Sequence, residues 1–514
     1  MQDNATPFIN SFGKRKRLKK RFHEESRLRY RVNDMNSLLD NNYELLIKYI
    51  KHHREIQQPR LIELQDYARG DNHTILEYNR VKNKEMADNR LVHNFGDLVA
   101  TFIQGYIAGK EIIVEYYDEE LEEEENATIN DFLHEVDRQN NTYQLNRSLI
   151  KTIAETGRAY DYVYQNQEDK IRIRKFDVRQ TFVIYDNTHA EHSVAAVRYY
   201  PKTQFTSEDD NTLIVEMYGN DNYVYLLELK QNELFDEDID EYAVNQIQIT
   251  EYLGNELGIG AYETHLSKID AYDAAQSDTA NYMQDISDAI LMIKGLMHMP
   301  RNSTPEQQID WLQKMLQSRL MHLKPPTDQD NKPVGDVDAK FLQKSYDSGG
   351  AEAFKTRLKD DIHAETGVPN LSDEKFGGVQ TGEAVRQKMF GLDQRIIDTM
   401  AHFEKSLKRR YELIGYLGVE NGSILNFNID HLDIRFTLNL PKALKEAIEA
   451  FNALGGEMSN ETILEITNIT DNVSQELERL KKEKIDDEGL IQNLAKKQRM
   501  TDLAVNSDAE DQTE

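Results

Sequence analysis

The sequence contains no cysteine among its 514 residues, with one tryptophan and 10 prolines. The absence of cysteine excludes disulfide bonds, thiolate zinc sites and cysteine nucleophiles, and it fits a reducing compartment. No apolar run approaches the ~18 residues that a membrane-spanning helix needs. The first residues also lack the apolar core of a signal peptide. We therefore expect a soluble, intracellular protein.

Positive charge is scarce, because 62 Lys and Arg stand against 91 Asp and Glu, for a formal net charge of −29. A general nucleic-acid binder would carry a basic footprint, so this class is disfavoured. A protein that handles DNA without holding it stays possible. The exception is the basic run at 14–21, KRKRLKKR. We predict a solvated tail over residues 1–21, with a contact to DNA or an acidic partner as the alternative.

Motifs for catalysis are missing as well. The sequence has no GxxxxGK[ST] phosphate loop, no HExxH and no GxSxG, and the string at 258–260, Gly-Ile-Gly, lacks a third glycine and a preceding strand. Carboxylates are so abundant that a pair of them in the sequence is no evidence for a catalytic site. We predict that the chain is not an enzyme and has no cofactor and no metal site.

The stretch from Val368 to Leu417 has the most pronounced pattern in the chain. Residues 369–380 contain a proline and a Gly-Gly pair, which predict a loop, and Thr381 can cap a following helix. Apolar residues then recur at helical spacing, predicting one helix of ~35 residues or roughly 50 Å. Gly391 is a plausible kink within it. The apolar positions are Val385, Met389, Leu392, Ile396, Met400, Phe403, Leu407, Tyr411, Leu413 and Ile414.

Before residue 260 the spacing of apolar residues changes from a helical period to a period of two. Helical spacing predicts three helices, at 35–69, 91–108 and 128–157. The carboxylate run that follows EIIVEYY is predicted to be a solvated loop. Alternating β-rich runs from 160 to 229 predict a small antiparallel sheet, and 231–260 is predicted to be a connector.

A second long helix is predicted from Tyr262. At ~100° per residue its apolar side carries Tyr272, Thr279, Ile286 and Ile290, and aspartates gather on the other side. In a monomer we expect a solvated aspartate face. The aspartates are Asp270, Asp273, Asp278, Asp285 and Asp288. A compact β-α-β insertion follows, and then another amphipathic helix that leads back to the loop at 369–380.

Several strings resemble viral portal proteins, the ring proteins through which tailed phages package DNA. The family pattern of an Asp and a Phe before small residues, then Ser-Gly-x-Ala, is similar to 372–378 (SDEKFGG) and 381–384 (TGEA). Thr381 replaces the commoner Ser but keeps a capping hydroxyl. Residues 266–273, LSKIDAYD, resemble the family's stem entrance, and 455–462, GGEMSNET, its crown turn.

The resemblance implies an α+β, mainly α portal fold with a helical wing and small β-sheet, a two-helix stem, an α/β clip, a long kinked helix and a helical crown. It implies the following parts: tail 1–21, wing 22–260, stem helix 1 at 261–292, clip 293–346, stem helix 2 at 347–368, channel loop 369–380, long wing helix and returning strand 381–440, crown 441–500 and acidic tail 501–514.

The resemblance also implies a function, in which a ring at one capsid vertex passes viral DNA inward and outward. Its partners would be other copies in a dodecamer, the large terminase subunit, a head-completion adaptor, capsid and scaffolding proteins and transient double-stranded DNA, without a membrane. The protein would be found in the virion, and in the host cytoplasm during assembly. The implied channel residues are Lys375, Asp373, Glu374, Asp270, Asp278, Asp285 and Asp288. The implied docking residues are Lys324, Asp328, Asp330, Lys332 and Asp336.

Two alternatives from other classes remain open at this point. One is a helical scaffold without a channel. The other is a metal-dependent DNA-processing enzyme that uses the acidic runs, although a clustered Asp/Glu/His/Lys set on strands is not evident in the sequence.

Overall fold

A computed structural model of the chain divides into two compact units, which we describe separately. Unit 1 comprises 1–71, 94–266 and 362–514, and unit 2 comprises 72–93 and 267–361. The structure describes residues 20–77, 87–203, 212–231, 233–241, 246–285, 290–294, 296–297, 304–318, 323–325, 327–328, 330, 332–335, 338–342, 347–370, 382–439, 477 and 479.

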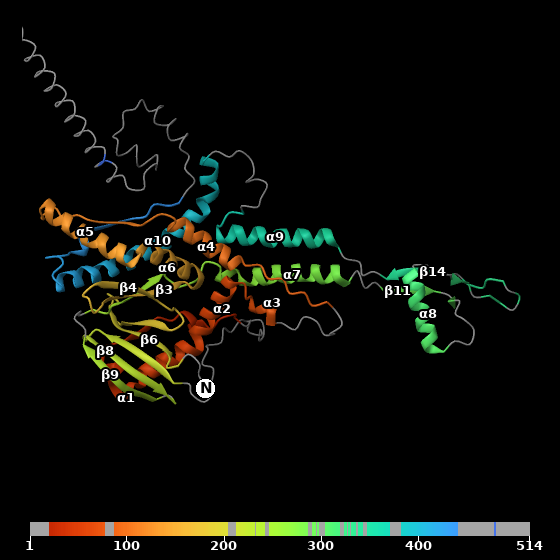
Figure 1. The fold of residues 1–514 in the computed structure, drawn as a ribbon, viewed down its shortest axis with the longest axis horizontal. Helices are drawn as coiled ribbons and strands as arrows, with labels where there is room; N and C mark the ends of the chain where they lie inside the picture. Colours follow the sequence, from red (N-terminus) through yellow and green to blue (C-terminus); the bar gives the residue numbers. More distant parts are fainter. Residues whose placement is uncertain are drawn as a thin grey trace, which may run out of the picture. The chain divides into compact units, whose positions relative to one another are not determined.

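Unit 1 contains a six-stranded sheet in the order β1-β5-β6-β7-β8-β9 (Figure 1). Strands β5 to β9 pair antiparallel, which confirms the antiparallel sheet expected from the period-two pattern, and β1 adds a parallel edge beside β5. The strands are β1 (Tyr30–Val32), β5 (Thr181–Asp186), β6 (Ser193–Pro201), β7 (Leu213–Gly219), β8 (Tyr223–Lys230) and β9 (Glu233–Glu241).

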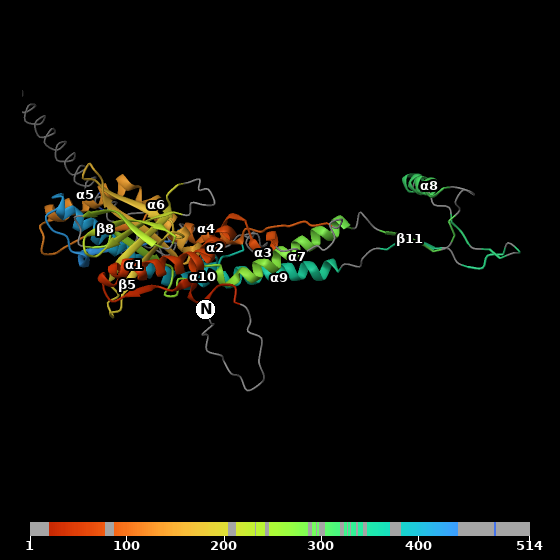
Figure 2. The same ribbon diagram turned by 90° about the horizontal axis from the view of Figure 1, so that it is seen from below.

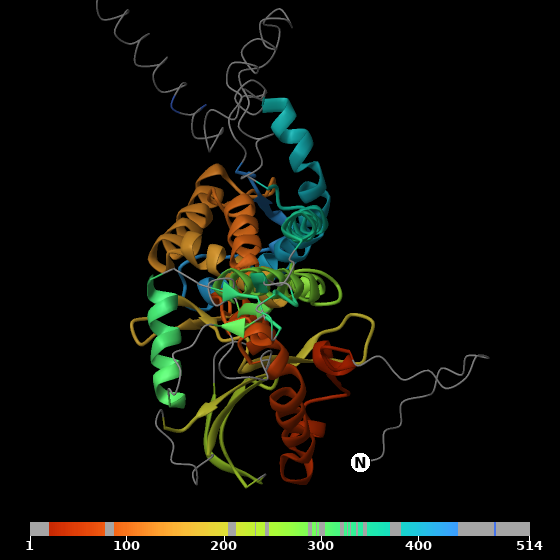
Figure 3. The ribbon, with the colours of Figure 1, turned by 90° about the vertical axis from the view of Figure 1, so that its right-hand side faces the viewer.

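One face of this sheet is covered by α1 (Asn36–His52), as Figure 3 shows. Leu38, Leu46 and Ile50 of the helix are fully buried against sheet residues such as Val197 and Val215. The apolar side of the helix and one face of the strands thus form a single core, because each would otherwise leave its apolar surface in water.

A second, three-stranded sheet has the order β10-β3-β4, from β10 (Ile249–Leu253), β3 (Arg158–Gln165) and β4 (Ile171–Phe176). A further pair joins β2 (Ile113–Tyr116) to β15 (Leu432–Arg435). The helical elements of unit 1 are η1 (Glu24–Arg27), η2 (His53–Gln57), α2 (Gln58–Arg69), α4 (Phe95–Ile107), α5 (Glu123–Asn140), α6 (Thr142–Thr156), η3 (Glu263–His265), α10 (Gly382–Glu420) and η6 (Ile429–His431).

The predicted long helix is confirmed as α10, which spans 39 residues. It changes direction along its length (Figure 1), and whether Gly391 is the pivot stays a prediction. A buried ion pair holds α10 in unit 1: Arg410 Nε lies 2.6 Å from Asp161 Oδ2, and both side chains are 0% exposed. Arg410 also donates to Asn146 Oδ1 (2.7 Å), and the Tyr252 hydroxyl donates to Asp161 (2.8 Å).

Three predictions in unit 1 need correction. The carboxylate run is not a loop throughout, because Glu122 caps α5 and Glu123, Glu124 and Glu125 form its first turn, where the helix dipole favours negative charge. The predicted helix 128–157 is two helices, α5 and α6, separated by a left-handed Asn141. The predicted connector 231–260 contains the strands β9 and β10.

Unit 2 contains most of two helices, α7 (Leu266–Asp285) and α9 (Ser348–Thr366), and also α3 (His73–Glu77) and α8 (Pro305–Ser318). Between α7 and α9 the chain forms two small antiparallel pairs, β11 (Ile290–Lys294) with β14 (Asp338–Leu342) and β12 (Leu296–Met297) with β13 (Leu323–Lys324). The predicted β-α-β insertion is thus confirmed. Ile290, predicted on a helix side, instead lies in β11, because the strand-forming run ILMIK follows the helix.

Candidate functional site

The segment that leads into α7 crosses the C-terminal end of α6. Gly254 N–H donates to the Gly157 carbonyl (3.0 Å), and Ala261 N–H donates to the Ala154 carbonyl (2.7 Å). Gly157 has φ +83°, and a Cβ there would lie 2.3 Å from the backbone of Gly258. Position 157 therefore requires glycine, because the backbone is left-handed there and a Cβ would collide with Gly258.

The Gly-Ile-Gly string at 258–260 belongs to the same close approach. A Cβ on Gly260 would lie 2.3 Å from the Glu155 carbonyl oxygen. This string, which fails as a phosphate loop by sequence, is thus a tight packing turn against the end of a helix.

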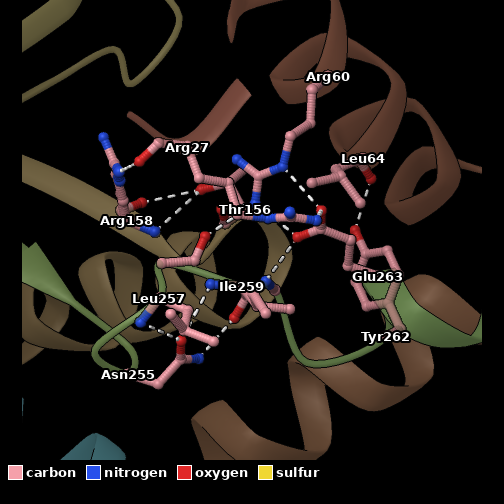
Figure 4. Close-up of polar contacts among 12 residues, drawn as sticks. Arg27, Arg60, Leu64, Thr156, Arg158, Asn255, Leu257, Ile259, Tyr262 and Glu263 are labelled. Carbon is pink, nitrogen blue, oxygen red and sulfur yellow. Dashed lines mark hydrogen bonds and ion pairs between the residues drawn. The ribbon is translucent and has the colours of Figure 1, made fainter. Parts of the chain in front are cut away.

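Glu263 is the centre of a buried clamp at the start of α7 (Figure 4). Arg60 of α2 donates from Nε to one carboxylate oxygen (2.8 Å) and from Nη2 to the other (2.5 Å). Gly260 N–H donates to the same carboxylate (2.9 Å), and Arg27 forms an ion pair with it. The Arg60 and Glu263 side chains are each 1% exposed, so the pair is desolvated and satisfied from several directions.

The same guanidinium also closes the end of α6. Arg60 Nη2 donates to the carbonyl oxygens of Thr156 (3.0 Å) and Gly258 (2.8 Å). A cation at a helix C-terminus is favourable, because the last carbonyls there lack helical partners and carry the negative end of the dipole. The clamp therefore joins α2, α6 and the entry to α7 through one arginine.

The charge state of Glu263 follows from these contacts. Burial alone would raise the pKa of the carboxyl, but the hydrogen bonds and charge of Arg60, the Gly260 N–H and the charge of Arg27 together lower the pKa below its usual range. The carboxylate is therefore ionised at neutral pH, which the paired arginines require.

The N-terminal segment is fastened by arginines at alternate positions. Arg27 pairs with Glu263, and Arg29 lies 3.0 Å from Glu191 and 3.5 Å from Glu251. Arg31 pairs with Glu191 as well. Arg27 ends the short helix η1 and Arg31 lies in β1, and the three guanidinium groups meet carboxylates from different elements of unit 1.

The helices α7 and α9 lie side by side (Figure 2). Lys355 of α9 is buried, and its Nζ lies 3.3 Å from Gln276 Oε1 and 3.4 Å from Thr279 Oγ1 of α7. It also pairs with Glu352, while Leu358 is buried one turn further along α9. Of the predicted apolar side of α7, Thr279 thus meets α9 through Lys355, whereas the Tyr272 ring packs edge-on against His93, with 4.8 Å between ring centroids.

The opposite side of α7 is not an open aspartate face. Asp273 is 0% exposed and accepts from Asn72 Nδ2 (2.5 Å), His93 N–H (2.9 Å) and His93 Nδ1 (3.0 Å). The prediction that Asp273 shares a solvated or channel-facing side is therefore wrong, because Asn72 and His93 cover it. Asp270 is half-buried and accepts from Thr74 Oγ1 (2.9 Å).

Of the other implied channel residues, some lie on α7 and the rest lie outside the described residues. Asp278 is exposed on α7, and Asp285 is the last residue of that helix. The remaining four, Asp288, Asp373, Glu374 and Lys375, lie outside the described residues. The structure therefore places Asp270, Asp278 and Asp285 on one helix, and the channel role of the whole set stays a prediction.

The implied docking residues fall on a strand and a turn of unit 2. Lys324 ends β13, and Asp328 accepts from the backbone N–H groups of Asp330 and Lys332 (2.9 Å each). Asp328 therefore organises the turn, while Asp330 and Lys332 are exposed. Asp336 lies outside the described residues.

Sequence reasoning missed the clamp and the cover on α7. Arg60 shares a helix side with the buried Leu64 and Tyr67, and an arginine on an apolar side is a signal for a buried ion pair. The partner, Glu263, is 203 positions away, so the pairing had no local signal.

Over the residues that the structure describes, no helix is long and apolar enough to cross a membrane. In the same residues no group of three or more His, Asp or Glu side chains could hold a metal ion.

Comparison with known families identifies a family for most of the chain. The sequence model of the family described as "Phage portal protein, SPP1 Gp6-like" matches residues 47–490. No curated protein matches the chain.

Comparison with solved structures gives distant likenesses. A chain in the neck of an empty GTA particle computed with C6 symmetry is 14% identical, with TM-score 0.41, covering 73% of this chain and 90% of that chain. A chain in the virion of a native gene transfer agent (GTA) particle is 12% identical, with TM-score 0.41, covering 80% and 94%. A chain in the neck of a native GTA particle computed with C12 symmetry is 13% identical, with TM-score 0.40, covering 80% and 94%. At these values the likenesses carry no argument about function.

Proposed function

This chain belongs to the SPP1 Gp6-like family of phage portal proteins, and on that premise we propose that it assembles into a closed ring at one capsid vertex through which viral DNA is packaged and ejected. Proteins of this family are structural channel proteins, so the chain is not an enzyme. The observation that carries the proposal is the extent of the family match, which runs through both units from 47 to 490.

The architecture of unit 2 supports the channel assignment. Two adjacent helices, α7 and α9, flank a small α/β insertion, as a stem and clip require. The proposed channel residues are Asp270, Asp278, Asp285, Asp288, Asp373, Glu374 and Lys375. A predominantly negative wall repels DNA phosphates, so the duplex slides without adhering.

Lys375 has a separate role in this proposal. It is the one basic residue between Val368 and Val385, so a ring would carry one such lysine per copy in the loop 369–380. Each ammonium would meet a passing phosphate at ~1 kcal/mol or less where water screens the contact. Contacts of that strength guide DNA and release it.

The docking surface in this proposal is the insertion at 293–346. The turn 325–338 carries exposed charged side chains on a backbone organised by Asp328. We assign to it the large terminase subunit during packaging and a head-completion adaptor afterwards. ATP hydrolysis would belong to the terminase, since this chain has no phosphate loop.

Packaging assays test the channel proposal. Lys375→Glu should leave the ring assembled while DNA packaging or retention falls, and Lys375→Arg should be mild because it keeps the charge. Normal packaging by Lys375→Glu in assembled particles would remove the lysine from the handling of DNA.

A further inference from the structure

The first described residues of unit 1 form a surface hollow with a positive balance of charge. Its volume is about 450 Å³, and it is lined by Lys20, Arg21, Phe22, His23, Glu24 and Arg27. Lys20, Arg21 and Arg27 are cations, and one side chain of the lining is a carboxylate. Lys20 and Arg21 are also the last two residues of the basic run 14–21, for which the sequence left a contact to DNA or an acidic partner open. We call this feature the basic hollow.

The lining of the basic hollow is held in place by neighbouring groups. Arg21 donates from Nε to Glu63 Oε1 (2.7 Å) and from Nη2 to the Tyr67 hydroxyl (2.6 Å), and both partners lie on α2. The Glu25 N–H donates to His23 Nδ1 (3.2 Å), so the proton of the neutral ring lies on Nε2, where it can be donated. The hollow therefore presents N–H donors at positions that the fold determines.

Two cations of the lining keep donors for a ligand. Lys20 Nζ lies 2.5 Å from its carboxylate partner Glu24, and an ammonium group has more N–H donors than this one contact uses. Within the described residues, the Arg27 guanidinium donates from Nη2 to Glu263 and from no other nitrogen. The Arg27 side chain is 29% exposed and lines the hollow, which brings unused donors within reach of a ligand.

Behind the hollow, arginine outnumbers glutamate. The ion pairs around Arg27 join five arginines to three glutamates, which leaves an excess of two positive charges in a chain with a formal net charge of −29. Burial lowers the pKa of Arg60, and the charges of Arg27 and Arg158 lower it further, against the opposing effect of Glu263. The arginines therefore repel one another, and an anion beside Arg27 would reduce that repulsion. The arginines are Arg27, Arg29, Arg31, Arg60 and Arg158, and the glutamates are Glu191, Glu251 and Glu263.

These donors suit a phosphate group. Phosphate offers several acceptor oxygens, and guanidinium and ammonium groups bind such oxygens through charge-assisted hydrogen bonds. We propose that the basic hollow binds a phosphate group, presented by duplex DNA or as free phosphate. Residues 14–19, KRKRLK, directly precede the hollow in the sequence, and their charge favours DNA, which carries many phosphates. The inference goes beyond the ring proposal and stands on contacts within unit 1, so it does not depend on assembly.

Lys20→Gln tests the site, because the Lys20 side chain is 69% exposed and its replacement should leave the fold intact. Removing one solvent-exposed charge should weaken phosphate binding by about two- to fivefold. Lys48→Gln is the matched control, since Lys48 lies 2.6 Å from Glu44, also four positions away, and its side chain is 65% exposed. The two variants change the net charge of the chain equally, so a difference between them belongs to the hollow.

The experiment measures the binding of two probes to the full-length protein at low salt, where such contacts are least screened. Inorganic phosphate is titrated by phosphorus NMR, and a short fluorescent DNA duplex is titrated by anisotropy. Weaker binding of either probe by Lys20→Gln, with Lys48→Gln equal to the wild type, supports the site. The probe that is affected identifies the source of the phosphate group.

Equal binding of both probes by the three proteins, or no binding of either probe, would overturn the proposal. Tighter binding of polyglutamate than of both phosphate probes would overturn it as well, since the hollow would then recognise the carboxylates of a protein partner. Lys20→Arg keeps the charge and should bind both probes as the wild type does. A loss of binding in that variant would count against a charge contact at this position.

Discussion

Glu263→Gln tests the clamp at the start of α7. The substitution keeps the size of the side chain and one carbonyl acceptor, but it removes the negative charge between Arg60 and Arg27. Arg60 then stays buried at 1% exposure with no carboxylate partner. Breaking a buried ion pair in this way lowers stability by about 3–5 kcal/mol. Because the amide oxygen of the new side chain can still accept a hydrogen bond, we expect a loss near the lower end, at about 3 kcal/mol.

The assay is native-state hydrogen exchange, because a chain of two units does not give one well-defined unfolding free energy. Gly260 N–H bonds to Glu263 itself, and Ala261 N–H bonds to the Ala154 carbonyl beside it. A loss of about 3 kcal/mol in local stability corresponds to roughly a hundredfold faster exchange of these two amides.

The matched control is Glu256→Gln, an exposed glutamate in the same segment. A surface substitution of this kind should change stability by less than about 0.5 kcal/mol. Equal exchange of Gly260 and Ala261 in both variants would show that Glu263 does not hold the entry to α7, and the clamp would lose its assigned role.

Asp161→Asn should destabilise unit 1 by about 3–5 kcal/mol, because it leaves Arg410 charged and without a carboxylate partner in the interior. Native-state hydrogen exchange of the α10 amides, against an exposed Asp430→Asn control, measures the loss, and unchanged exchange would contradict the assignment. The lowered pKa of Glu263 means that its contribution to stability is complete above the ordinary value of 4.5 and is lost as pH falls through the lower folded value. Acid titration should therefore destabilise the wild type more steeply below about pH 4.5 than Glu263→Gln, and parallel curves would contradict this. Deleting the turn 325–338 should leave the assembly intact and abolish terminase or adaptor binding in a pull-down; loss of the assembly itself would count against the docking assignment.

Much of the fold was predictable where local pattern decides it. The helix α10 follows from the repeated spacing of residues such as Leu392, Ile396 and Phe403, all of which are buried. Strands β5 to β8 follow from period-two runs between turn residues. The carboxylate run at the start of α5 was misjudged because the same Glu residues suit a solvated loop and a helix N-terminus, and capping geometry decides between them.

The long-range parts of the site were not predictable in this way. Asp273 has the same type and spacing as its neighbouring aspartates on α7, yet it is buried by Asn72 and His93, which lie about 200 and 180 positions away. The burial of one carboxylate among several depends on which segment packs there, and helical periodicity says nothing about that segment. The same limit hid the pairing of Arg60 with Glu263.

The most direct test of the central claim is the mass and shape of the purified full-length protein, measured by light scattering and electron microscopy at moderate salt. Salt matters because each copy has a formal charge of −29, and screening shortens the repulsion between copies to about 8 Å at physiological ionic strength. The account predicts closed rings of uniform copy number, with an open centre wide enough for duplex DNA. A monodisperse monomer, or open chains without a central channel across the salt range, would contradict it.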